Sequence, residues 1–142
     1  MNCLFCDLLT TRERAADILF EDHDVLVLLH EAWATLGHTV VVAKRHVENT
    51  SALEESEWVR MSRTFRRVEA SLLAVTGADR AILMKLGLMV PHLHLHIYPV
   101  SNALTRDEVF AIINGQTRHE ASAEERGEFV ASLKRRILAE LA

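Results

Sequence analysis

The chain has 142 residues, 49% of them hydrophobic and 25% charged, and its formal net charge at pH 7 is -4. This length and composition are typical of one globular domain, which we expect to comprise residues 1–142. The negative charge argues against a nucleic acid polymer as partner, and the apolar runs are too short to cross a bilayer. Because the first residues lack a basic segment followed by an apolar one, we expect a cytoplasmic protein with no membrane partner.

Two cysteines stand at the start of the chain, Cys3 and Cys6, in the spacing Cys-x-x-Cys. In a cytosolic protein this spacing favours metal or redox chemistry over a structural disulfide. A buried packing pair is an equally common use of cysteine. The spacing alone therefore leaves a metal site and a packing role open.

Strands are expected in the first and middle parts of the chain. Residues 18–21 and 25–29 read as a hairpin, and residues 38–43, which are rich in β-branched side chains, read as a third strand. The apolar run at residues 81–87 and the histidine-rich segment 90–100 are expected to form two more.

Helices are predicted by the pattern Ser/Thr-x-x-Glu, which can cap a helix start. It occurs at residues 51–54, 105–108 and 122–125, each followed by apolar residues at helical spacing, and Gly77 and the pair 114–115 are natural stops. The helix that begins at the Ser51 cap is expected to be the long central one, and residues 101–142 are expected to be a helical C-terminal extension. Because the strands are segregated from the helices, the pattern implies an α+β fold with an antiparallel sheet covered by helices.

Three histidines alternate with apolar residues in "VPHLHLHIYPV", residues 90–100. Since the side chains of a strand alternate between its two faces, His92, His94 and His96 are expected on one face, with the intervening leucines on the core face. Neighbouring imidazoles are then roughly 6.6 Å apart along the strand, close enough to share a metal or to bracket a phosphate. From the residues alone, a metal site and a nucleophilic site are equally well supported, and a purely structural role is the less favoured third alternative.

The nucleophilic alternative has a clear chemical basis. A neutral imidazole attacks phosphorus well, and a neighbouring imidazolium can stabilise phosphate oxygens and hold the proton that a leaving group needs. Three imidazoles this close cannot all be charged, so we expect them to titrate together, in a mixed protonation state near neutrality.

With these residues the chain resembles the histidine triad (HIT) family, whose signature alternates histidine with apolar residues as residues 92–98 do. The segments "CLFC", "LFEDHDVLVLL" and "GHTVVVAKRHVENTSAL" also resemble, in order, the cysteine pair, first hairpin and Gly-His to Lys-x-His pattern of the family. The resemblance implies a HIT-like α+β fold with an antiparallel sheet of about five strands, one long central helix and C-terminal helices. It also implies a homodimer across which the sheets pair.

The resemblance further implies a hydrolase or nucleotidyl transferase that acts on a small-molecule nucleotide: a nucleoside phosphoramidate, a dinucleoside polyphosphate or a related phosphate ester. In the family, the middle triad histidine attacks the α-phosphorus to form a nucleotidyl-histidine, and the third acts on the phosphate and the leaving group. The catalytic roles then fall on His94 and His96, with no metal required for the chemistry. Substrate-binding roles are expected for His30, His38, Lys85 and His92.

Family members with the cysteine pair commonly hold a structural zinc ion. Carried over to this chain, the resemblance implies the ligands Cys3, Cys6, His46 and His92. Such a Cys₂His₂ tetrahedron is a closed site, so it would tie the N-terminal segment to the sheet without taking part in catalysis.

Several positions depart from the family pattern. His30 stands where an Asp or Asn commonly bonds ribose, Leu88 and Met89 cannot donate hydrogen bonds to a phosphate, and Val100 replaces a frequent arginine. These changes leave fewer groups to bind a nucleotide. The alternative function is therefore a zinc-stabilised nucleotide-binding or regulatory dimer with little or no catalysis.

Overall fold

The computed structural model describes residues 2–141, with side chains to residue 140. Within these residues, five strands form one antiparallel sheet in the order β1-β2-β3-β5-β4. The strands are β1 (Ile18–Glu21), β2 (Val25–Leu29), β3 (Thr39–Ala43), β4 (Arg80–Met84) and β5 (His94–Val100). The first hairpin lies at the residues predicted for it, and β3 and β4 lie within one residue of their predicted starts.

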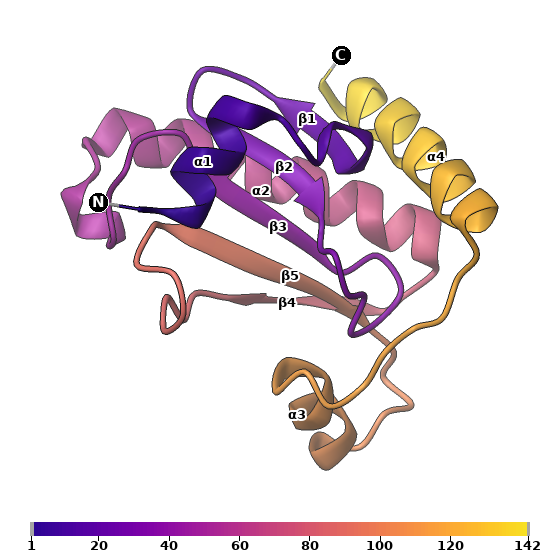
Figure 1. The fold of residues 1–142 in the computed structure, drawn as a ribbon. Helices are drawn as coiled ribbons and strands as arrows, with labels where there is room; N and C mark the ends of the chain where they lie inside the picture. Colours follow the sequence, from indigo (N-terminus) through magenta and orange to yellow (C-terminus); the bar gives the residue numbers. More distant parts are fainter. Residues whose placement is uncertain (1, 142) are drawn as a thin grey trace.

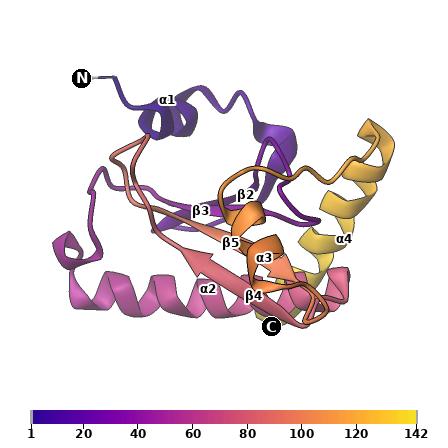
Figure 2. The ribbon, with the colours of Figure 1, turned by 90° about the horizontal axis from the view of Figure 1, so that it is seen from below.

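Helices cover both faces of the sheet, as the two views in Figures 1 and 2 show. One face carries α1 (Leu4–Thr11), and the other carries α2 (Glu55–Thr76) and α4 (Ala123–Leu141). The short helix α3 (Arg106–Ile113) follows β5 and packs Ile112 against Tyr98 and Val100 at the end of that strand. The α+β architecture predicted from the sequence is confirmed, including a long central helix and two helices after residue 101.

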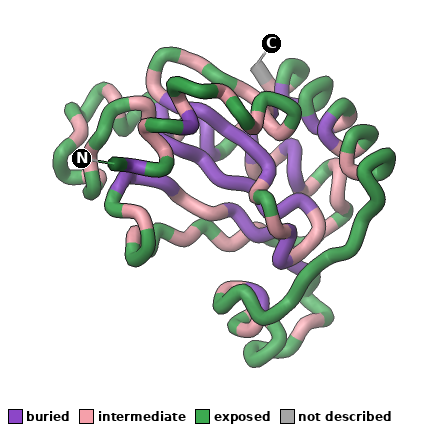
Figure 3. The backbone as a smooth tube through the Cα atoms, in the orientation of Figure 1, coloured by how far each residue is buried: buried purple, intermediate pink, exposed green. Residues whose placement is uncertain are grey.

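The strand β2 is buried on both faces (Figure 3) because each face packs against a different helical layer. Its residues Val25, Val27 and Leu29 belong to the main core under α2 and α4. Its residues Leu26 and Leu28 belong to a smaller core closed by Leu8 of α1, together with Val40 and Val42 of β3. The continuous apolar run "VLVLL" is therefore explained by helices on both sides of the sheet.

The predicted start of α2 is wrong by one turn. Residues Thr50–Ala52 form a 3₁₀ turn, and the helix is instead capped by Glu54, whose backbone N–H donates to Glu57 at 3.0 Å in a capping box. The segment contains two overlapping box patterns, and the second also lets Glu57 accept from Arg45 at 2.9 Å. The end of α2 at Gly77, with φ of 72°, is as predicted.

The two C-terminal helices begin at the residues predicted to cap them. The hydroxyl of Thr105 accepts from the N–H of Glu108 at 3.2 Å, and that of Ser122 accepts from the N–H of Glu125 at 3.1 Å. Val130, Leu133 and Ile137 of α4 join the main core against β1 and α2. Among the described residues, no helix combines the length and the apolar character that crossing a bilayer requires.

The histidine segment is extended as predicted, but β5 begins only at His94. Leu93 and Ile97 lie in the main core, while His94 and His96 point to the face that carries α1, where they pair in register with Val42 and Val40. His92 precedes the strand because the backbone bends there, where its N–H donates to the carbonyl of Val90 at 2.9 Å. This bend gives His92 different neighbours from the other two histidines.

Candidate functional site

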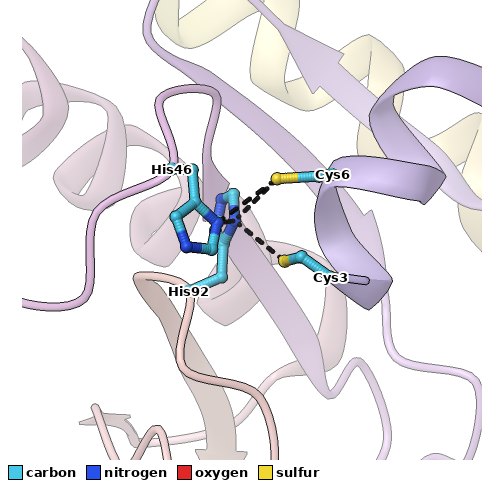
Figure 4. A group of neighbouring side chains, drawn as sticks. All are labelled: Cys3, Cys6, His46 and His92. Carbon is cyan, nitrogen blue, oxygen red and sulfur yellow. Dashed lines mark hydrogen bonds between the residues drawn. The ribbon is translucent and has the colours of Figure 1, made fainter. Parts of the chain in front are cut away.

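Four side chains from three separate segments converge beside the N-terminus of α1 (Figure 4). Cys3 and Cys6 come from α1 and the residue before it, His46 from the loop after β3, and His92 from the bend before β5. Nδ1 of His92 lies 3.4 Å from Sγ of Cys3, 3.5 Å from Sγ of Cys6 and 3.1 Å from Nδ1 of His46, and Sγ of Cys6 lies 3.3 Å from Nδ1 of His46. The structure thus brings together all four residues predicted as metal ligands.

The three sulfur–nitrogen separations fit a tetrahedral metal centre, and the nitrogen–nitrogen separation of 3.1 Å is slightly shorter than in such a centre. Bonds of about 2.3 Å to sulfur and about 2.0–2.1 Å to nitrogen place neighbouring ligand atoms roughly 3.3–3.8 Å apart. Nε2 of His92 lies 2.6 Å from the carbonyl of Ala43, so the proton is on Nε2 and the lone pair of Nδ1 is directed into the cluster. A backbone carbonyl that fixes the tautomer in this way is typical of metal-binding histidines. The residues present can therefore hold a metal ion with two thiolates and two imidazoles.

His94 lies next along the chain and has a defined tautomer. Its Nδ1 lies 2.6 Å from the carbonyl oxygen of His92, which can only accept, so Nδ1 carries the proton. The ring of Phe5 in α1 packs against it with a centroid distance of 4.6 Å. Nε2 of His94 therefore carries the lone pair, on a ring that is only 8% exposed and lines a cavity.

A hydrogen bond with the buried His38 orients His96. We assign the proton of His38 to Nε2, because the N–H of Ala34 points at its Nδ1 at 3.4 Å, and Nε2 then donates to Nδ1 of His96 at 2.9 Å. Nδ1 of His96 is then an acceptor, and its proton is on Nε2. His94 and His96, whose rings lie 5.4 Å apart, thus have opposite tautomers, one with a free lone pair and the other with a free N–H.

His30 completes this side of the site. Its ring stacks on that of His38 at 4.3 Å with an interplanar angle of 8°, and its Nδ1 lies 2.8 Å from the carbonyl of Ala32. The N–H of Ala32 also approaches the same nitrogen at 3.1 Å, but one nitrogen cannot both donate and accept. We assign the proton to Nδ1 because the contact with the carbonyl is shorter.

Burial favours the neutral form of four imidazoles, those of His30, His38, His92 and His96. Desolvation, with smaller contributions from neighbouring histidines, lowers the pKa of His38 to about 2 and that of His96 to about 4. Desolvation also lowers the pKa of His30 and of His92. The mixed protonation state was expected for the three triad histidines, and in the free protein desolvation instead favours the neutral imidazole at two of them, His92 and His96.

His30, His38 and His96 also bring ring nitrogens within 4.8 Å of one another, but their geometry does not suit a metal. A metal ion lies close to the plane of each imidazole that binds it. The rings of His30 and His38 are stacked and nearly parallel, so their planes do not meet at a common ion. The nitrogens of His38 and His96 are instead joined by a hydrogen bond.

A cavity of about 390 Å³ opens beside His94 and His96. Its walls come from α1, the ends of β2 and β3, the loop after β2 and the loop before β5, and they are mainly apolar: Leu4, Phe5, Leu28, Val40, Leu86, Leu88, Met89 and Val90. Its other charged or polar side chains are His30, Glu31 and Arg14, and Arg14 already donates to Asp17 at 3.0 Å and to the carbonyl of Leu29 at 2.5 Å. The cavity therefore offers little unpaired positive charge.

Three of the four predicted substrate-binding residues do not line this cavity. His38 is buried behind His96, and His92 faces the cysteine cluster. Lys85 is exposed and donates to the side chain of Asn49 at 2.7 Å. Leu88 and Met89 do line the cavity and are 81% and 93% exposed, whereas Val100 is buried against α3.

Phe5, Arg14 and Glu31 line the cavity and were not identified from the sequence. Phe5 lies inside the "CLFC" segment, and a helical reading of residues 4–11 would have placed its side chain near the two cysteines. Arg14 and Glu31 carry no local signal, because only the packing of α1 and the loop after β2 brings them to the cavity.

A family model described as the HIT domain matches residues 11–103. Over 110 residues the chain is 28% identical to adenosine 5'-monophosphoramidase HINT3 of Xenopus tropicalis, with 73% of this chain and 71% of that protein covered. Over 106 residues it is 29% identical to Protein hit of Bacillus subtilis, with 69% and 70% covered.

Solved structures share the whole fold. A zinc-bound histidine triad family protein from Mycobacterium smegmatis superposes with a TM-score of 0.72 at 23% identity, over 100% of this chain and 99% of that one. A hypothetical histidine triad nucleotide-binding protein from Sulfolobus tokodaii gives a TM-score of 0.76 at 22% identity, over 96% and 93%. These matches confirm the HIT-like fold, with its five-stranded antiparallel sheet and flanking helices.

Proposed function

The chain belongs to the HIT domain family, and from this premise we propose that it is a nucleotide hydrolase or nucleotidyl transferase whose nucleophile is His94. One observation carries the proposal: the hydrogen bond from Nδ1 of His94 to the carbonyl of His92 at 2.6 Å. It leaves the lone pair on Nε2, beside a cavity large enough for a small ligand. A preset tautomer removes the need to move a proton before attack.

The proposed reaction has two steps. Nε2 of His94 forms a bond to the α-phosphorus while the bond from phosphorus to the leaving group breaks, and that group takes the electron pair and a proton from Nε2 of His96. Water then attacks phosphorus, the phosphorus–nitrogen bond breaks, and the electron pair returns to His94 while the water proton passes to His96. Another acceptor in place of water would make the protein a transferase.

His96 needs a second proton for the first step, and we propose that the substrate brings about its uptake at Nδ1, with His38 changing to the tautomer whose Nε2 accepts from that N–H. In the free protein, burial lowers the pKa of His96 to about 4. A phosphate placed against Nε2 adds a negative charge, which favours the imidazolium form and raises that pKa. The imidazolium form of His96 is then populated only when a phosphate is bound beside it.

The charge of the cavity favours a substrate with a single phosphate. A dinucleoside polyphosphate carries several negative charges, whereas the only arginine or lysine lining the cavity, within the described residues, is Arg14, and it is already paired with Asp17. Leu88 and Met89 offer no donors. We therefore propose a nucleoside phosphoramidate, or a related ester with one phosphate, as the substrate.

We propose that the metal cluster holds a structural zinc ion on Cys3, Cys6, His46 and His92. Zinc would supply a rigid link between α1 and the sheet, and the chemistry requires no metal. Burial and the neighbouring Cys3 raise the pKa of the Cys6 thiol, so metal binding must displace its proton.

We also propose a cytoplasmic homodimer. The strand β4 is an edge of the sheet and its Leu83 is exposed, so β4 can pair with the same strand of a second copy. Light scattering of the purified protein would test this, and a monomer at micromolar concentration would contradict it.

A second candidate function is nucleotide binding without efficient turnover. It is favoured by the exposed, apolar Leu88 and Met89 at the cavity, which cannot bond a phosphate as it changes shape in the transition state. Under this alternative, the protein would bind a nucleotide and raise its melting temperature without consuming it.

Incubation with adenosine 5'-phosphoramidate and with a dinucleoside polyphosphate distinguishes these functions. We expect turnover of the first, lost in His94→Ala and kept in His23→Ala, since His23 is an exposed histidine remote from the cavity. Mass spectrometry of quenched protein should show one nucleotidyl group on His94. Binding without turnover would support the second function, and turnover that survives His94→Ala would refute the first.

A further inference from the structure

The loop of residues 30–34, which follows β2, forms one rim of the cavity through His30 and Glu31. Within it, no residue belongs to a strand or helix, so its backbone carbonyls have no regular partners. All five are nevertheless satisfied: the carbonyl of Ala32 accepts from Nδ1 of His30, and the other four accept from residues far along the chain. Because buried carbonyls need hydrogen-bond donors, residues far along the chain hold this irregular loop in place.

Those four donors lie in residues 117–126, between α3 and the first turn of α4. Arg126 donates to the carbonyl of His30 at 2.8 Å and to that of Glu31 at 3.4 Å. The N–H of His119 donates to the carbonyl of Trp33 at 2.7 Å, and the hydroxyl of Thr117 to that of Ala34 at 2.6 Å.

Arg126 is itself held in place. Its guanidinium donates to Asp17 from Nε at 3.2 Å and from a terminal nitrogen at 3.1 Å, which supplies the countercharge. It also lies over the ring of Trp33, with Cζ 4.9 Å from the centroid. A planar group with five donors can satisfy a carboxylate and two carbonyls at once, which a lysine cannot do.

We propose that residues 117–126 position the rim of the catalytic cavity and that Arg126 is the central positioning residue. The link reaches the chemistry by direct contacts: Arg126 bonds the His30 carbonyl, the His30 ring stacks on His38, and His38 donates to His96. This segment lies outside residues 11–103, which match the family model, so part of the active-site framework of this chain is supplied from beyond that match.

The test uses the whole chain and needs no substrate, so it is independent of the proposed function. Nitrogen NMR of the histidine side chains reports the tautomer and environment of His30, His38 and His96, and hydrogen exchange reports the opening of residues 30–34. The variants are Arg126→Ala, the conservative Arg126→Lys, and Thr117→Val, which replaces the hydroxyl by a methyl group of similar size. The matched control is Arg136→Ala, on the same helix, where Arg136 is half-exposed and pairs with Glu140 at 3.4 Å.

In Arg126→Ala we expect the imidazole signals of His30 and His96 to shift. Amide exchange in residues 30–34 should accelerate by about ten- to a hundredfold, as the loss of one or two charge-assisted hydrogen bonds implies. Arg126→Lys should show smaller changes of the same kind. Thr117→Val should show faster amide exchange near Ala34. Arg136→Ala should change neither the imidazole signals nor the exchange.

A merely structural role predicts something else: a lower melting temperature with unmoved imidazole signals. That outcome in Arg126→Ala, or equal shifts in Arg136→Ala, would overturn the proposal. If Arg126→Ala does not fold, Arg126→Lys and Thr117→Val decide, and unchanged signals and exchange in both would reject it.

Discussion

Acid should destabilise this protein well above the pH at which its carboxylates titrate. The pKa of His38 is about 2 and that of His96 about 4 when folded, both lowered by burial from the ordinary value of 6.5. Below pH 6.5 the unfolded chain binds protons at these two histidines while the folded protein does not, so stability is full above that pH and falls as the pH decreases.

The magnitude follows from the difference in proton binding. Each such histidine costs about 1.4 kcal/mol for every pH unit below 6.5 until its folded pKa is reached, so two of them cost about 4 kcal/mol between pH 7.5 and pH 5. Both folded values lie at or below about 4, so this loss depends little on their exact size. It is a large share of the 5–15 kcal/mol by which domains are usually stable.

Urea unfolding at a series of pH values measures this loss. His38→Gln should reduce it by about 2 kcal/mol, since one site no longer titrates, even if the variant is less stable at every pH. Proton release from a bound metal contributes equally in both proteins and cancels in the difference. The exposed His23→Gln should leave the loss unchanged. A flat profile from pH 7.5 to 5, or the same loss in His38→Gln, would refute the assignment of His38 as buried and neutral.

Other predictions address the metal, the core and the cavity. Cys6→Ser should lower the zinc content from about one equivalent per chain to almost none by elemental analysis, since three ligands bind more weakly than four, and retained zinc would contradict the ligand set. Leu133→Ala, at a side chain with 0% exposure, should cost about 2–5 kcal/mol of unfolding free energy, whereas Leu138→Ala on the same helix, 64% exposed, should cost almost nothing. Met89→Arg should tighten the binding of a dinucleoside polyphosphate by about tenfold in low salt, and calorimetry showing no gain would contradict the account of cavity charge.

Local patterns in the sequence predicted most of the elements. The β-branched runs and the short polar turn at residues 22–24 define the first three strands, because strand formation and tight turns depend on neighbouring residues. The helix caps at Thr105 and Ser122 are equally local. Where two capping patterns overlap, as before α2, the sequence does not choose, and the contact of Glu57 with Arg45, 12 residues away, favours the later one.

The candidate site was predicted in part. The alternating histidines identified the strand that carries the candidate catalytic residues. The resemblance to the family supplied the four metal ligands, which the structure brings together. The different orientation of His92 was not predictable from the alternation, because it results from a bend stabilised by Val90 and from a carbonyl of β3. The neutral state of His96 was missed for a similar reason, since desolvation depends on what the fold packs around a side chain.

By itself, the sequence determined the alternation that gives the segment "HLHLH" a core side and a histidine side, and the residue types available to bind metal and phosphate. Only the tertiary structure decided that His92 faces the cysteine cluster while His94 and His96 face the cavity. The hydrogen bonds of His92 to Ala43 and of His38 to His96, and the contacts of residues 117–126 with the cavity rim, join positions that are 49 to 96 residues apart. A tautomer is set by whichever acceptor or donor the fold places against the ring, and no local pattern encodes that partner.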